Sequence, residues 1–222
     1  MKKEKKIYKE PSSEPVIVEE PFAMYYPKLN LDETKRYTYA DYLTWLDDKR
    51  RELIDGFIYL MPAPKRIHAH LVTESGNLFY TFTRKKEKKK YYIYYAPFDV
   101  RLTLNNETSD DKIYDVVQPD ICIICDSSKL DDKGCIGAPD LVVEILSTST
   151  LKKDWNYKFN LYEAAGVREY WIVDPNTRRV NVFLLQPDGR YNMGTTYNCN
   201  QKTPVHIIEG LEIDLKELFE NE

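Results

Sequence analysis

The chain has 222 residues, and its 32 Lys and Arg against 36 Asp and Glu give a net charge of −4. This length suits one domain whose core needs no disulfide or metal staples. No apolar run reaches the roughly 20 residues of a membrane span, and the N-terminus lacks the apolar segment of a secretory signal. We therefore expect a soluble cytoplasmic protein, and the acidic balance argues against a generic polyanion binder.

The first 24 residues mix runs of Lys and Glu with Pro and Ser. Such a composition is typical of a flexible tail, because it cannot bury enough apolar surface to fold alone. We expect residues 25–222 to form a single domain.

Helical and strand patterns follow one another through this domain. The helices are expected at 39–48, 67–84, 147–166 and after Asp214. The strands are expected at 91–95, 98–104, 116–125, 141–146, 169–173, 180–185, 191–196 and 203–208. Thr38 and Asp41 suit a capping box, Asp55-Gly56 suits a hairpin turn, and Gly166 suits a helix end. The order predicts an α/β fold with a mixed sheet flanked by helices, plus added hairpins.

Two of the four cysteines, Cys122 and Cys125, form a C-x-x-C pair. In a strand, positions i and i+3 point to opposite faces, so these thiols should diverge. No second pair or nearby His completes a zinc set. We interpret them as reduced core residues.

A carboxylate stands inside one of the most apolar strands. In DLVVEIL at 140–146, alternation places Asp140, Val142, Glu144 and Leu146 on one face and the apolar residues between them on the other. A strand this apolar is typical of burial on both faces. Glu144 is therefore costly unless it is paired or binds a metal.

Asp120 and Lys158 also occupy positions where apolar residues are expected. Asp120 interrupts the apolar strand VVQPDICII, and Lys158 falls on a helical stripe with Leu151, Trp155 and Tyr162. Two acids and a lysine that point inward from neighbouring elements suit metal-assisted phosphodiester hydrolysis. The carboxylates would bind Mg²⁺, and the lysine would orient the attacking water or stabilise negative charge.

Four motifs follow one another along the chain: QPD at 118–120, APDLVVEILSTST at 138–150, the D-x-x-x-K of Asp154 and Lys158, and GVREYWIVDP at 166–175. Together with the ELIDG hairpin at 52–56, they resemble the Uma family of endonucleases between about residues 37 and 185. The resemblance implies the restriction-endonuclease-like fold of the PD-(D/E)-x-K superfamily. It also implies a DNA substrate, Mg²⁺ or Mn²⁺ as cofactor, and a homodimer.

The resemblance assigns roles to individual residues. Asp120 matches the PD aspartate and Glu144 the acid of (D/E)-x-K. The lysine of that motif should stand at position 146, which is Leu, so Lys158 on the following helix is expected to replace it. Glu52 of ELIDG is expected to add a carboxylate near the metal. Either His70 or His68 matches a family histidine, and their spacing does not decide between them.

Further residues are candidates with simpler alternatives. Gln118, Ser147 and Asp154 could support the site or contact substrate, while Asp140 more simply caps a turn. Asp120 could be an ordinary turn acid, and Glu144 could pair structurally with a base. The alternatives for Lys158 are a pair with Asp154 or an ammonium that extends to solvent.

The leading functional hypothesis is a Mg²⁺-dependent DNA endonuclease with Asp120, Glu144 and Lys158 at its centre. A second hypothesis is a nuclease-fold module that binds nucleic acid or assembles with protein without turnover. Glycoside hydrolysis by paired carboxylates is a weaker third idea. The basic run at 84–90 would provide local positive charge for phosphates, or it is a solvated charge run.

Overall fold

The computed structural model describes residues 6–8, 16–18, 29, 31–85, 91–104, 107–147 and 153–220. Within the segment expected to be a tail, the short strands β1 (Lys6–Tyr8) and β2 (Val16–Val18) pair antiparallel. The rest of that segment lies outside the described residues, as does most of the basic run, at 86–90.

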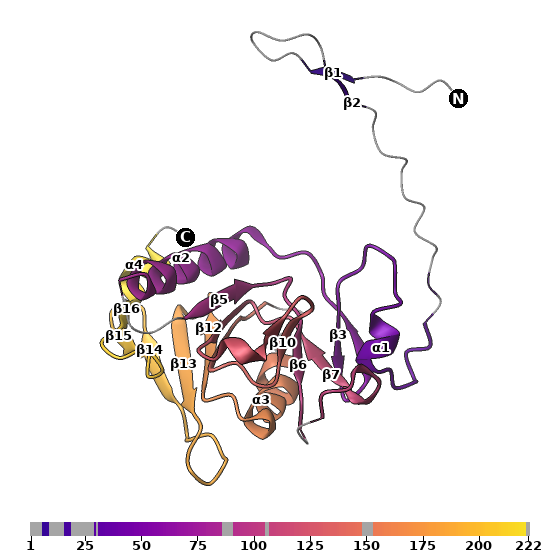
Figure 1. Ribbon diagram of the computed structural model, residues 1–222. Helices are drawn as coiled ribbons and strands as arrows, with labels where there is room; N and C mark the ends of the chain where they lie inside the picture. Colours follow the sequence, from indigo (N-terminus) through magenta and orange to yellow (C-terminus); the bar gives the residue numbers. More distant parts are fainter. Residues whose placement is uncertain are drawn as a thin grey trace.

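Two six-stranded sheets form the frame of the molecule (Figure 1). The first has the order β4 (Phe57–Leu60), β3 (Arg51–Ile54), β7 (Asp115–Val117), β6 (Val100–Leu102), β10 (Gly134–Ile136) and β9 (Leu130–Asp131). The second has the order β14 (Thr195–Asn198), β13 (Arg179–Leu184), β12 (Glu169–Asp174), β11 (Leu141–Ile145), β8 (Ile121–Ile124) and β5 (Tyr92–Tyr95). Both sheets are mixed, since β6 and β10 are parallel in one and β11 and β12 in the other.

The helices are α1 (Tyr39–Tyr42), α2 (Arg66–Thr83), α3 (Phe159–Ala165) and α4 (Leu215–Phe219). A π-helical turn, η3 (Lys153–Lys158), leads into α3, and β15 (Lys202–Pro204) pairs with β16 (Glu212–Asp214). Short 3₁₀ turns are η1 (Asp110–Lys112) and η2 (Ser127–Lys129). The α/β class is confirmed, with two mixed sheets where the sequence predicted one. Within the described ranges, no helix has both the length and the apolar character that a membrane crossing needs.

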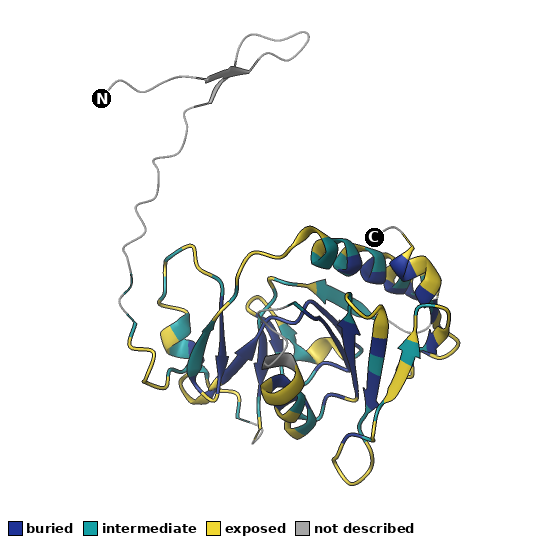
Figure 2. Cartoon of the chain, turned by 180° about the vertical axis from the view of Figure 1, so that it is seen from behind, coloured by how far each residue is buried: buried dark blue, intermediate teal, exposed yellow. Residues whose placement is uncertain are grey.

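The second sheet is buried on both faces. Leu141, Val143 and Ile145 of β11 join one core cluster with residues of α2 and α4, which lie side by side in Figure 1. Val142 of the same strand joins a second cluster with α3 and with strands of the other sheet. Figure 2 shows this burial as dark blue along the central strands. The expected alternation in β11 is therefore confirmed.

The chain passes from one sheet to the other at Gln118-Pro119-Asp120. The single strand expected at 116–125 is wrong, because β7 belongs to the first sheet and β8 to the second. Pro119 has no N–H to continue a ladder, so pairing stops there. Asp120 consequently lies at a junction of the sheets rather than in the middle of a strand.

Several local predictions are confirmed. Thr38 and Asp41 form the capping box of α1, although the helix ends at Tyr42 and not at 48. The hairpin turn between β3 and β4 has positive φ at Asp55 (51°) and Gly56 (77°). The helix end at Gly166 has φ 88°, and the Asp214 side chain caps α4 by accepting from the Lys216 N–H.

The segment before α3 departs from the predicted helix. Residues 153–158 form a π-helical turn, whose wider spacing breaks the regular stripe on which Trp155 and Lys158 shared a face. Lys158 is 1% exposed, whereas Trp155 is 37% exposed, so the prediction of a core Trp155 is wrong. Trp171, by contrast, is buried.

The C-terminal strands are shorter than predicted. The strand expected at 191–196 is wrong: Tyr191 forms an isolated bridge with Leu185, and β14 starts after Gly194, whose φ of 76° interrupts extended backbone. The strand expected at 203–208 is reduced to β15.

Candidate active site

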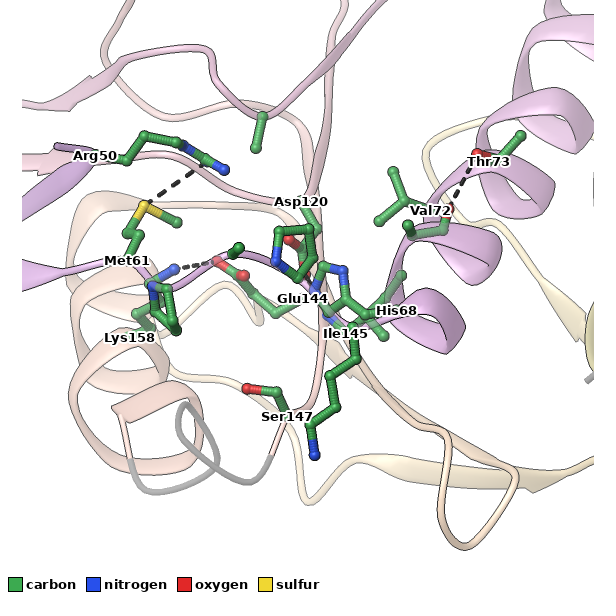
Figure 3. Close-up of a pocket in the computed structure, with 16 residues that line it drawn as sticks. Arg50, Met61, His68, Val72, Thr73, Asp120, Glu144, Ile145, Ser147 and Lys158 are labelled. Atoms are coloured by element: carbon green, nitrogen blue, oxygen red, sulfur yellow. Dashed lines mark hydrogen bonds and ion pairs between the residues drawn. The ribbon is translucent and has the colours of Figure 1, made fainter. Parts of the chain in front are cut away.

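A pocket of about 540 Å³ opens beside the junction of the two sheets. Its walls come from the loop after β4, the first turns of α2, the start of β8 and the end of β11 (Figure 3). The lining residues are Arg50, Met61–Lys65, His68, Ala69, Val72, Thr73, Ala96, Asp120, Glu144, Ile145, Ser147 and Lys158. The three residues expected to carry the chemistry therefore line one pocket.

Asp120 is held in place by two donors. Its Oδ2 accepts from the backbone N–H of Ile145 at 2.7 Å and lies 2.9 Å from Nε2 of His68. No described residue donates to Oδ1 of this carboxylate. Since an ionised carboxylate only accepts, the His68 Nε2 must carry a proton in this contact. Asp120 is thus fixed to the end of β11 with an acceptor oxygen left for a ligand.

Glu144 is buried and shares one oxygen between two donors. Its Oε1 accepts from Lys158 Nζ at 2.7 Å and from the Tyr162 hydroxyl at 2.7 Å. Burial raises the pKa of Tyr162 well above its ordinary value, so this hydroxyl keeps its proton and donates it. Because Lys158 is 1% exposed, the alternative that its ammonium reaches solvent is wrong.

Glu52 lies on the other side of the same ammonium. Its Oε1 is 2.8 Å from Lys158 Nζ and accepts from the Gln118 backbone N–H at 2.9 Å. Glu52 is fully buried and is not among the described residues that line the pocket. Glu52 therefore contacts Lys158 without lining the pocket itself, and its metal-binding role stays a prediction.

His68 and His70 occupy different positions relative to the pocket. His68 lines the pocket and contacts Asp120, whereas His70 does not line it. Nε2 of His70 is buried without a hydrogen-bond partner among the described residues. The choice that the sequence left open therefore falls on His68.

The supporting candidates lie at different distances from the pocket. Ser147 lines it, and Gln118 is buried behind it, where its side chain bonds to Arg50. The Asp154 side chain lies outside the described residues. Asp140 accepts from the Cys125 N–H at 2.7 Å and pairs with Arg168 at 2.9 Å, away from the pocket, so its side chain joins distant segments and does not cap a local turn.

The donor set suits a cation that needs few protein ligands. Asp120 and Glu144 supply hard carboxylate oxygens at one pocket, and Mg²⁺ commonly takes one or two carboxylates while keeping several waters. Among the described residues, no group of three or more His, Cys, Asp and Glu is arranged to hold a metal. The residues therefore fit a water-rich Mg²⁺ or Mn²⁺ site and not a closed structural one.

Some members of the site were not singled out from the sequence. Tyr162 was expected on the Lys158 stripe, and its i+4 spacing was the signal that could have identified it as a partner of Glu144. Arg50 and Met61 gave no such signal, because their approach to the pocket depends on how β3 and β4 meet the second sheet.

The chain is similar to known proteins over most of its length. The family model described as "Uma2: Putative restriction endonuclease" matches residues 39–216, a range that contains every residue lining the pocket. The uncharacterized protein slr1290 of Synechocystis sp. is 25% identical over 167 residues, which cover 74% of this chain and 78% of that protein.

One solved structure is similar over most of the chain. It is the crystal structure of a protein from Anabaena variabilis described as a "putative nuclease belonging to DUF820". The TM-score is 0.65 at 18% identity, and the match covers 83% of this chain and 98% of the other. At this identity the likeness concerns the fold.

Proposed function

Because this chain belongs to the Uma2 family and has a restriction-endonuclease-like fold, we propose that it is a metal-dependent nuclease that hydrolyses phosphodiester bonds in DNA. Asp120 and Glu144 are proposed to bind Mg²⁺ or Mn²⁺, and Lys158 to act beside them. His68 is proposed to hold Asp120 in its orientation.

The charge of the buried set is the observation that carries this proposal. Glu52 and Glu144 share the ammonium of Lys158, and Asp120 lies against the His68 imidazole; all three carboxylates are buried. Gathering three carboxylates in a buried site is expensive unless cations compensate their charge. Asp120 and Glu144 reach the pocket wall, where a divalent cation would add to that compensation.

The chain's own groups have separable tasks in hydrolysis. A bound divalent cation would lower the pKa of a coordinated water and offset charge on the phosphate. Lys158, fixed between Glu52 and Glu144, places its positive charge at the pocket wall, beside the attacking water or the developing negative charge. Glu52 contacts this ammonium directly and Tyr162 holds its other partner, Glu144, so the charge needs no reorganisation during the reaction.

Incubation of plasmid DNA with the protein and Mg²⁺ or Mn²⁺ tests the proposal, with EDTA as the metal-free arm. We expect metal-dependent nicking that falls at least about 100-fold in Asp120→Asn, since this variant keeps the shape but loses the charge that binds metal. Asp140→Asn is the matched control, because Asp140 is also buried but lies away from the pocket. Nicking that is equal in both variants would refute the assignment.

The same experiment decides between the enzyme and a nuclease-fold module without turnover. Binding of DNA without nicking by the wild-type protein, with either metal, would support the module. A homodimer and a cytoplasmic location stay predictions from the sequence.

A further inference from the structure

Arg50 lines the pocket, and its side-chain partners among the described residues are neutral. Its Nε and Nη2 donate to Gln118 Oε1 at 3.1 and 3.0 Å, and Nη2 also lies 3.8 Å from Met61 Sδ. No described carboxylate forms an ion pair with Arg50. By contrast, carboxylates pair with each of the following arginines: Arg36, Arg51, Arg101, Arg168 and Arg190.

The neutral partner of Arg50 is itself fixed in one orientation. Nε2 of Gln118 donates to Asp99 Oδ1 at 2.9 Å and lies 3.3 Å from the Tyr42 hydroxyl. Because the Asp99 carboxylate only accepts when ionised, the amide NH₂ must face it and the amide oxygen must face Arg50. Gln118 therefore orients the guanidinium without neutralising it.

The two carboxylates that line the pocket form ion pairs with groups other than Arg50. Asp120 pairs with His68, and Glu144 pairs with Lys158. Figure 3 shows Arg50 beside Met61, on the opposite side of the pocket from His68. Nη1 of Arg50 donates to no described residue. The guanidinium thus lies at the edge of the pocket without an ion-pair partner among the described residues, and with Nη1 available to donate.

We infer that Arg50 forms a phosphate-binding subsite that holds a non-reacting backbone phosphate of the nucleic acid strand. A guanidinium presents donors in a planar fork that matches phosphate oxygens, and its charge is always present. The inference rests on the proposed function for the identity of the strand. It goes beyond that function in separating strand binding, by Arg50, from the reacting centre at Asp120, Glu144 and Lys158.

Binding without metal tests this subsite independently of cleavage. The probes are a fluorescently labelled 20-base-pair DNA duplex and a labelled single strand of the same length, titrated in EDTA over a range of salt concentrations. Arg50→Gln removes the charge, and Arg50→Lys retains a charge without the fork. Arg190→Gln is the matched control, because Arg190 is an exposed arginine on a loop outside the pocket. Thermal unfolding confirms that each variant is folded.

We expect Arg50→Gln to weaken binding of at least one probe several-fold and to lower the slope of log K against log salt by about one. Arg50→Lys should recover part of the affinity and most of the slope, and Arg190→Gln should match the wild type. An unchanged slope in Arg50→Gln, an equal effect of Arg190→Gln, or no binding of either probe by the wild type would overturn the inference. If Arg50→Gln loses DNA binding and the wild-type protein never nicks DNA, the proposed function is refuted while the role of Arg50 in binding the strand stands.

Discussion

Lys158 shares its buried ammonium between two carboxylates, with Nζ 2.7 Å from Glu144 Oε1 and 2.8 Å from Glu52 Oε1. Glu52 belongs to β3 of the first sheet and Glu144 to β11 of the second. The ammonium therefore connects the two sheets at the wall of the pocket, and the same contact serves the stability of the fold and the proposed chemistry.

Replacing Lys158 with Met should lower both stability and activity. The substitution leaves two buried carboxylates without their shared cation, a change that costs about 3–5 kcal/mol when one partner of a buried pair is removed. Urea unfolding monitored by Trp fluorescence measures the loss. The double variant Glu52→Gln/Lys158→Met should recover part of that stability, because one unpaired charge is removed. It should not recover DNA cleavage, because the ammonium is still missing. A Lys158→Met protein as stable as the wild type would show that the bridge is energetically unimportant.

The contact between His68 and Asp120 predicts unequal effects of the two histidines. His68→Ala removes the group that orients the Asp120 carboxylate, a proposed metal ligand. Loss of such an orienting partner lowers metal affinity or activity by roughly 10- to 100-fold. His70→Ala should retain activity, because His70 does not line the pocket. Nicking rates and Mn²⁺ affinities of the two variants are the measurements. Equal losses, or a larger loss in His70→Ala, would contradict the assignment of His68.

The inward direction of Glu144 was predictable from the sequence because it follows from local periodicity. Alternation in β11 places Glu144 on the α3 side, and the Pro119 break marks Asp120. Lys158 was predicted to be buried from a regular helical stripe, and it is buried although the π-helical turn breaks that stripe. The predicted pattern and the observed packing therefore agree for Glu144, whereas Asp120 and Lys158 are buried in local structures that differ from the predicted strand and helix.

The contacts that complete the site could not be predicted, because they join segments that are distant in the sequence. The pairing of Glu52 with Lys158 depends on the first sheet packing next to α3, and the selection of His68 depends on where α2 crosses the end of β11. The sequence predicted a single sheet, since nothing in a strand's periodicity reports which sheet it joins. The ELIDG glutamate was accordingly assigned to the metal rather than to the lysine.

Burial of Asp99 predicts a measurable dependence of stability on pH. Burial raises the pKa of this carboxyl above its ordinary 3.8, despite hydrogen bonds from Gln118, Tyr39 and Tyr42. A raised folded-state pKa favours folding at pH below 3.8, and that contribution is lost as the pH rises through the raised value. Asp99→Asn cannot ionise, so its free energy of unfolding relative to the wild type should increase from pH 4 to pH 7. Denaturation curves at unit intervals of pH test this, and a constant difference would refute it.

Gly134 begins β10, in the core of the first sheet, and has a conformation that other residues avoid. Its φ is 130°, and a Cβ there would collide with the backbone carbonyl oxygen of Asp99, which cannot move without disturbing β6 and the carboxylate that orients Gln118. Gly134→Ala should therefore lower the free energy of unfolding by more than about 2 kcal/mol. Gly189→Ala, with φ 78° and nothing within 4 Å of its Cβ, isolates the backbone strain alone and should cost about 1 kcal/mol. Urea unfolding of the two variants separates collision from strain, and equal losses would show that the approach of Asp99 to Gly134 is not tight.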